Sequence, residues 1–129
     1  MPTEKIFSVI VENKPGTLAA VARTIGDAGV NIQGVCQSVE ANVGVVRLWT
    51  NDANKTREAL KKGNYPCLES DALVVQCVNQ PGELAAKAKA LTDAGINIEQ
   101  TWAVGQETGQ KVALVFQVND VKKAAQILK

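Results

Sequence analysis

The sequence predicts an α+β protein made of two β-α-β-β-α-β units, each with an antiparallel sheet and helices on one face. Three observations indicate this fold class. The chain repeats itself at an offset of 66 residues, because 12 of the 20 positions in 13–32 are identical in 79–98. Each repeat alternates short β-branched runs with helical periodicity. A composition of 46% hydrophobic but only 4% aromatic residues indicates a core of aliphatic side chains in a chain of 129 residues.

The first repeat opens with a strand and a helix. Ile6–Val11 is a run of β-branched and aromatic residues, typical of a strand buried on both faces. Asn13–Gly16 ends the strand, and Pro15 suits a helix start because the N–H that it lacks would be unsatisfied there. Gly29 ends the helix. We expect one helical face of each repeat to lie in the core, namely Leu18, Val21, Ala22 and Ile25 and, in the second repeat, Leu84, Ala88 and Leu91.

The remaining elements follow from turn and strand signals. In chain order we expect a strand from Asn31 to about Ser38, a turn at Asn42 and Gly44, a strand over Val45–Thr50, a helix over Asn54–Lys62 and a fourth strand over Cys67–Ser70. The second repeat carries about two extra residues, since Asn119-Asp120 follows Asn51-Asp52 by 68 residues. It ends in or just after its second helix, so we expect its last strand to be missing or supplied from elsewhere.

Composition argues against several classes of protein. The net charge is +1, whereas nucleic-acid and membrane-surface partners favour a basic surface. The chain has no histidine, the commonest general base and metal ligand. Its three cysteines, Cys36, Cys67 and Cys77, form no CxxC motif, so we expect no metal site, no cofactor and no reactive thiol. No apolar segment resembles a signal peptide or a membrane span, and we therefore expect a soluble, cytoplasmic protein.

One motif occurs in both repeats at the same spacing. It comprises Asn13-x-Pro15-Gly16-x-Leu18 with Gly29-Val30-Asn31-Ile32, and Asn79-x-Pro81-Gly82-x-Leu84 with Gly95-Ile96-Asn97-Ile98. Both repeats thereby resemble the ACT domain, a small ligand-binding module of amino-acid metabolism. The first repeat is particularly similar to the serine-sensing ACT domain of phosphoglycerate dehydrogenases. The resemblance covers nearly the whole chain and implies two tandem ferredoxin-like domains, 1–70 and 71–129.

The resemblance also implies how such domains work. ACT domains pair side by side, and effector amino acids bind at the pairing, between the Pro-Gly loop and the strand that carries the asparagine. The domain is usually attached to an enzyme, whereas two domains use up the whole of this chain. The resemblance therefore implies a regulatory protein that has no catalytic residues of its own.

The chemistry of a free amino acid suggests which residues would bind it. Backbone N–H groups at a helix start favour a carboxylate, and Gly16, Thr17 and Leu18 supply them in the first repeat. Side-chain oxygens of Asn13 and Asn31 favour an ammonium group. The candidate ligand-binding residues are Asn13, Pro15, Gly16, Thr17, Leu18, Asn31 and Ile32 in the first repeat and Asn79, Gly82, Glu83, Leu84, Asn97 and Ile98 in the second. Since Glu83 stands where the first repeat has Thr17, and would repel a carboxylate, we expect the two sites to differ.

These candidates also have purely structural interpretations. Pro15-Gly16 can form a simple turn, Asn13 can cap the helix, and Asn31 can tolerate a bend before its strand. Trp49 and Trp102 do not correspond between the repeats. Either can pack at an interface, and Trp102 can instead line a ligand pocket.

Several functions compete on these grounds. The leading hypothesis is a non-catalytic regulatory protein that binds an amino acid, forms a homodimer and signals to a partner enzyme or transporter. The alternative is an interaction or dimerisation subunit that binds no ligand. An acylphosphatase-like enzyme would need an arginine, and Arg23, Arg47 and Arg57 are present, but no phosphate-binding glycine loop accompanies them. An RNA-binding sheet would display aromatic residues, whereas these strands have Val and Leu.

Overall fold

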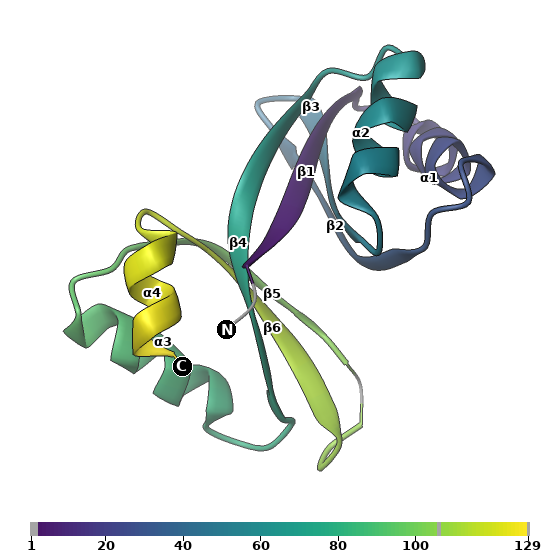
Figure 1. The fold of residues 1–129 in the computed structure, drawn as a ribbon. Helices are drawn as coiled ribbons and strands as arrows, with labels where there is room; N and C mark the ends of the chain where they lie inside the picture. The colour runs from purple at the N-terminus through teal and green to yellow at the C-terminus, as the bar shows by residue number, and fades with distance from the viewer. Residues whose placement is uncertain (1–2, 106, 129) are drawn as a thin grey trace. The chain divides into compact units, whose positions relative to one another are not determined.

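The computed structural model describes residues 3–105 and 107–128. Its elements are β1 (Thr3–Glu12), α1 (Thr17–Asp27), β2 (Ile32–Glu40), β3 (Val43–Thr50), α2 (Ala53–Lys62), β4 (Cys67–Val78), α3 (Glu83–Asp93), β5 (Ile98–Val104), β6 (Lys111–Val118) and α4 (Val121–Ile127) (Figure 1). The strands are hydrogen-bonded in the order β2-β3-β1-β4-β6-β5. Within each repeat the hairpin strands are antiparallel, so the predicted fold class is confirmed. Among the described residues, no helix is long and apolar enough to cross a membrane.

Internal contacts divide the chain into two compact units. The first unit is Lys5–Ser70, and the second begins at Asp71 and also takes in residues 3–4 at the start of β1. In the first unit α1 and α2 cover one face of the sheet, and in the second α3 and α4 do the same (Figure 1). Each unit therefore has the layered arrangement that the repeats predicted.

One long strand occupies the junction between the repeats. The sequence predicts a fourth strand of the first repeat that ends at Ser70 and a separate first strand of the second repeat, but the structure has a single strand, β4. The N–H of Ile10 donates to the carbonyl of Pro66, at 2.9 Å, just before this strand begins. The physical reason for the continuity is local, because the residues from Glu69 to Ala72 include no Gly, Pro or Asn to end the extended run.

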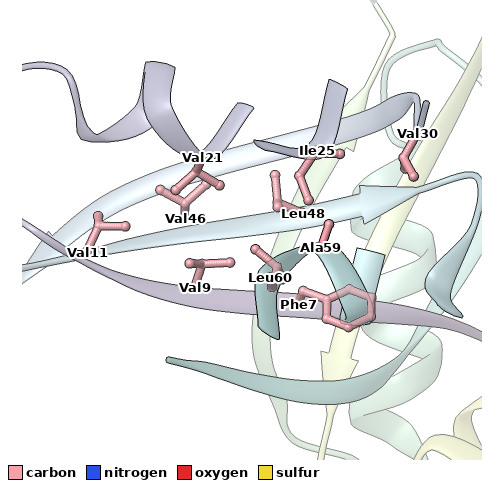
Figure 2. Close-up of a cluster of buried hydrophobic side chains, with 10 residues drawn as sticks. All are labelled: Phe7, Val9, Val11, Val21, Ile25, Val30, Val46, Leu48, Ala59 and Leu60. Carbon is pink, nitrogen blue, oxygen red and sulfur yellow. The ribbon is translucent and has the colours of Figure 1, made fainter. Parts of the chain in front are cut away.

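Each unit has its own aliphatic core between its helices and its sheet. Figure 2 shows the core of the first unit, which consists of Phe7, Val9, Val11, Val21, Ile25, Val30, Val46, Leu48, Ala59 and Leu60. The core of the second unit consists of Leu73, Val75, Leu91, Ile96, Val112, Leu114, Phe116, Val118, Ala124 and Leu128. Each core holds one phenylalanine, in keeping with the low aromatic content.

The first-turn leucines of α1 and α3 do not belong to these cores. Leu18 is 39% exposed and Leu84 is 48% exposed, so the prediction that both lie in the core is wrong. In α1 only Val21 and Ile25 are buried. The helix thus packs on the sheet from its second turn onward, and its first turn stays in solvent. Helical periodicity shows which side of a helix is apolar but not where along its length the packing begins.

The repeated Asn-Asp pair has a structural role in both units. The backbone N–H of Asn31 donates to Oδ1 of Asn51 at 3.0 Å, and that of Asn97 donates to Oδ1 of Asn119 at 3.0 Å. The aspartate that follows each asparagine is the N-cap of the next helix, α2 or α4. The pair therefore joins the start of the second strand to the start of the second helix in each repeat.

We expect Asp52→Ala to lower the free energy of unfolding by about 1 kcal/mol. The Asp52 carboxylate accepts a hydrogen bond from the N–H of Lys55 at 3.0 Å, and its loss leaves a helix-start donor unsatisfied. Urea denaturation followed by circular dichroism would measure the change. The control is Asp27→Ala, which removes the same carboxylate from the C-terminal turn of α1, where it is unfavourable. An equal loss in both variants would contradict the assignment of Asp52 as a cap.

Candidate ligand-binding site

The first unit has an open cavity at the N-terminal end of α1. Its volume is about 690 Å³, within the range of small-molecule sites. We call it the α1 cavity, and it is lined by Ile10, Val11, Glu12, Asn13, Lys14, Thr17, Ala20, Asn42, Val43, Tyr65 and Pro66. Of the residues that the sequence predicted for ligand binding, Asn13 and Thr17 line this cavity.

Asn13 fixes the loop at the edge of the α1 cavity. Its Nδ2 donates to Oδ1 of Asn42 at 3.1 Å. Asn42 and Ala41 have positive φ angles of 61° and 50°, which form the tight turn between β2 and β3. Asn13 does not cap α1, because the N-cap residue is Gly16 and no side chain of the described residues bonds to that helix start. Its role is to tie the loop before α1 to the β2–β3 turn.

The N-terminus of α1 is open to an anion. Gly16 has a φ of 92°, a left-handed conformation that favours glycine. Thr17 directs its hydroxyl back to the carbonyl of Lys14, at 3.2 Å. The first turn of α1, all of whose residues the structure describes, contains no acidic residue. Its N–H groups and partial positive charge are therefore available to a ligand carboxylate.

The second unit has a cavity beside α3, which we call the α3 cavity. Its volume is about 530 Å³, and it is lined by Asn79, Gln80, Gly82, Glu83, Leu84, Ala85, Ala88, Ala103, Val112 and Leu114. Glu83 lies in the first turn of α3. Its Oε1 accepts a hydrogen bond from Nε2 of Gln80 at 2.8 Å, and its Oε2 lies 3.8 Å from Nζ of Lys87. The protein's own carboxylate therefore holds the place that Thr17 leaves open in the first unit.

Asn79 has the same kind of role as Asn13. Its Nδ2 donates to the carbonyl of Glu107 at 3.2 Å, and its backbone bonds to Gly109 and Gln110 at 2.7 Å each. These partners lie in the turn between β5 and β6, which contains the extra residues of the second repeat. In both units the asparagine before the Pro-Gly turn thus ties that loop to the neighbouring hairpin.

The second asparagine of each motif lies far from the first within its own unit. Asn31 follows the C-terminal end of α1, whereas Asn13 precedes its N-terminal end, and an 11-residue helix is ~16 Å long. Asn97 has the same place relative to α3. Ile32 and Ile98 are partly buried against the core of their own unit. Neither unit by itself therefore brings Asn13 and Asn31, or Asn79 and Asn97, to one ligand.

A protein-family model described as "ACT domain pair" matches residues 2–129. The chain belongs to this family. No curated protein matches it closely in sequence. Among solved structures, protein BT0572 from Bacteroides thetaiotaomicron is 25% identical, with a TM-score of 0.89 over 98% of this chain and 86% of that one. The ligand-free regulatory subunit of aspartate kinase from Thermus thermophilus has 15% identity and a TM-score of 0.70, covering 98% of this chain and 91% of that one. Synechocystis aspartate kinase has 19% identity and a TM-score of 0.65, over 98% of this chain and 24% of that one.

Nine of the eleven residues that line the α1 cavity of this ACT pair were not among the predicted ligand-binding residues, and four of the nine are charged, aromatic or proline residues beside the start of α1. Glu12 and Lys14 flank Asn13, and Tyr65 and Pro66 come from the loop between α2 and β4. Glu12 and Lys14 could have been found, because they are charged residues beside the motif that differ between the repeats. Tyr65 and Pro66 carry no such signal, since only the folded chain brings them beside α1.

Two of the three arginines considered for a phosphate site, Arg47 and Arg57, are bonded to other residues of the ACT pair. Arg57 forms a two-pronged salt bridge with Glu69 and lies 5.9 Å from the ring centre of Phe7. The hydrogen bond from Arg57 lowers the pKa of the Glu69 carboxyl. Arg47 donates to the hydroxyl of Ser38 at 3.2 Å. The two arginines thus have protein partners on different elements, which does not favour the acylphosphatase-like alternative.

The sequence also raised the questions whether a cysteine is a reactive thiol and whether a tryptophan lines an interface or a ligand pocket. Burial raises the pKa of the Cys77 thiol, and the nearby Glu83 raises it further while Lys87 lowers it. Such a thiol is mostly protonated at neutral pH and therefore a weak nucleophile. Trp49 is buried and Trp102 half-buried, and the indole N–H of each has no hydrogen-bond partner among the described residues. Trp102 does not line either cavity, so the cavities do not support its interpretation as a pocket residue.

Proposed function

We propose that this ACT pair is a non-catalytic, cytoplasmic regulatory protein that binds a free amino acid and signals its presence to a partner enzyme or transporter. The observation that carries the proposal is the open, acid-free N-terminus of α1 inside a cavity large enough for a small molecule. A carboxylate is the ligand group that such a helix end favours. The fold shared with a regulatory subunit of aspartate kinase supports a regulatory role.

The first repeat is the proposed main site. In the second repeat Glu83 occupies the corresponding helix start and is paired with Gln80 and Lys87. A ligand carboxylate would meet a like charge there, whereas in the first repeat it would meet Thr17. We therefore assign the effector to Asn13, Gly16 and Thr17, with Pro15 and Leu18 shaping the loop.

Pairing between two chains would complete this site. The edge strands of the sheet are β2 in the first unit and β5 in the second, and β2 contacts α1. Leu18 and the β2 residues Val35 and Val39 are 39%, 48% and 51% exposed. Apolar side chains so placed favour association. A partner module on that side would bring its own Asn31 or Asn97 toward the open helix start, which supports the asparagine as a ligand to the ammonium group.

We therefore expect the purified protein to be a homodimer. Size-exclusion chromatography with multi-angle light scattering should give twice 13.7 kDa at micromolar concentration. Val35→Lys should shift the mass toward that of a monomer, because it places a charge on the exposed edge strand. Leu68→Lys is the control, since Leu68 is 70% exposed but lies on β4. A monomer at high micromolar concentration would contradict the homodimer.

A thermal-shift screen with the twenty amino acids tests the proposed function. A ligand at 100 times its dissociation constant should stabilise the protein by about 2.7 kcal/mol, which gives a clear rise in melting temperature. Asn31→Ala and Asn97→Ala, measured by calorimetry with the ligand found, then identify the partner asparagine. If only Asn31→Ala loses binding, the site lies between the first repeats of two chains. If only Asn97→Ala loses binding, the site lies between the first repeat of one chain and the second repeat of the other. No binder at all, together with a stable protein complex, would favour the ligand-free interaction subunit.

A further inference from the structure

We propose that the α1 cavity selects a neutral amino acid with an apolar side chain, and that Glu12 and Lys14 hold its head group. This inference rests on the proposed function and deepens it, because it names the ligand class and the residues that choose it. It places the ligand's side chain between α1 and the Tyr65–Pro66 loop. That position lies on the α2 side of the helix, within one unit.

The inner part of the α1 cavity is apolar. Val11 is 8% exposed and belongs to the core of the unit. Tyr65 packs against the same core and stands beside Pro66 at the start of β4. Ala20 faces them from the second turn of α1. An alanine at this place leaves room for a ligand side chain, and aliphatic or aromatic groups gain the most by leaving water here.

The rim of the cavity matches a zwitterion. Oε2 of Glu12 lies 3.3 Å from Nζ of Lys14, and their side chains are 77% and 61% exposed. An ion pair so exposed contributes little to the stability of the protein. Each of its two side chains can therefore leave the other and bind a ligand group with little loss of stability. Lys14 and the open N-terminus of α1 favour the carboxylate of an amino acid. Glu12 and Oδ1 of Asn13 favour its ammonium group.

Charges explain the preference for a neutral ligand. Glu12 and Lys14 are the charged residues among those that line the cavity in the described chain, and the ligand's head group would use both. A further charge on the ligand's side chain would then lie between Val11, Ala20 and Pro66 without a partner, which is costly. Aspartate, glutamate, lysine and arginine should therefore bind much more weakly than leucine, isoleucine or phenylalanine.

The second unit lacks this set of residues. The positions of Glu12 and Lys14 are Val78 and Gln80 in the second repeat, and that of Thr17 is Glu83. The described residues of the second unit place no tyrosine beside α3, since the single tyrosine of the chain is Tyr65. The α3 cavity therefore provides a matched site where the proposed recognition is absent.

Isothermal titration of the full chain with L-leucine, L-isoleucine, L-phenylalanine, L-aspartate and L-lysine tests the inference. We expect the apolar probes to bind and the charged probes to bind at least about tenfold more weakly. Ala20→Leu should fill the cavity and weaken the best probe by about tenfold or more. Ala86→Leu is the matched control at the corresponding position of α3, and it should leave binding unchanged. Both alanines are exposed on helices, where leucine is well tolerated.

A second titration separates the head-group contacts. Lys14→Gln, which installs the residue of the second repeat, should weaken the binding of L-leucine by about tenfold. It should change the affinity for L-leucinamide little, because L-leucinamide has no carboxylate.

If an amino acid binds and Ala20→Leu leaves its affinity unchanged, the inference is wrong while the proposed function stands. If only charged amino acids bind, the inference is again wrong and the proposed function again stands. If none of the twenty amino acids binds, the proposed function and this inference both fail.

Discussion

Phe7→Ala should lower the free energy of unfolding by about 3–5 kcal/mol. Phe7 is fully buried in the core of the first unit and lies under the guanidinium of Arg57. Its removal leaves a cavity that β1, β3 and α2 cannot easily close, and it also removes the ring that attracts the cation. For a domain whose total stability is of order 5–15 kcal/mol, this is a large fraction. Urea denaturation followed by circular dichroism would measure it.

Two variants provide the comparison for Phe7→Ala. Phe116→Ala removes the one phenylalanine of the second core, which is also fully buried, and should cost a similar amount. Leu68→Ala truncates a side chain that is 70% exposed and should change the stability by less than about 0.5 kcal/mol. A loss below about 1 kcal/mol in Phe7→Ala would show that the first unit closes around the missing ring, contrary to a close-packed core.

Thr17→Glu should weaken binding of the effector amino acid by at least about tenfold. Two unit charges 5 Å apart repel each other by roughly 3 kcal/mol at an effective dielectric constant of about 20, although solvent in the open cavity reduces this. The new carboxylate would stand at the helix start, as Glu83 does in α3, and would also compete for Lys14. At the same time it should stabilise α1 by a few tenths of a kcal/mol. Lower affinity would thus accompany slightly higher stability.

Isothermal titration with the amino acid found by the thermal-shift screen measures the effect of Thr17→Glu. The reciprocal change, Glu83→Thr, is the control, and it should leave the affinity within about twofold of the parent. Thr17→Val removes the hydroxyl without adding charge and separates repulsion from a lost hydrogen bond. If Glu83→Thr alters binding and Thr17→Glu does not, the effector site lies in the second repeat.

The sequence by itself determined the repeat, the order of the elements and the bounds of α1 and α2, whereas β1, β2 and β3 extend two or three residues beyond the predicted strands. The helix predicted after Pro15-Gly16 begins at Thr17, and Gly29, with a φ of 76°, follows its end. These features are local, because helix periodicity, strand composition and the needs of a positive φ are all decided by residues close together in the chain. The ACT motif could be recognised for the same reason, since its residues lie within about 20 positions of one another in each repeat.

Tertiary structure alone decided what those local features do. It left Leu18 and Leu84 in solvent, and it placed Asn13 against Asn42 rather than at the helix as a cap. It also brought Tyr65 and Pro66 beside α1 to form one wall of the α1 cavity. Each of these outcomes depends on contacts between segments that are distant in the chain. Such contacts are set by how whole helices pack on the sheet, and no short-range pattern of residues encodes them.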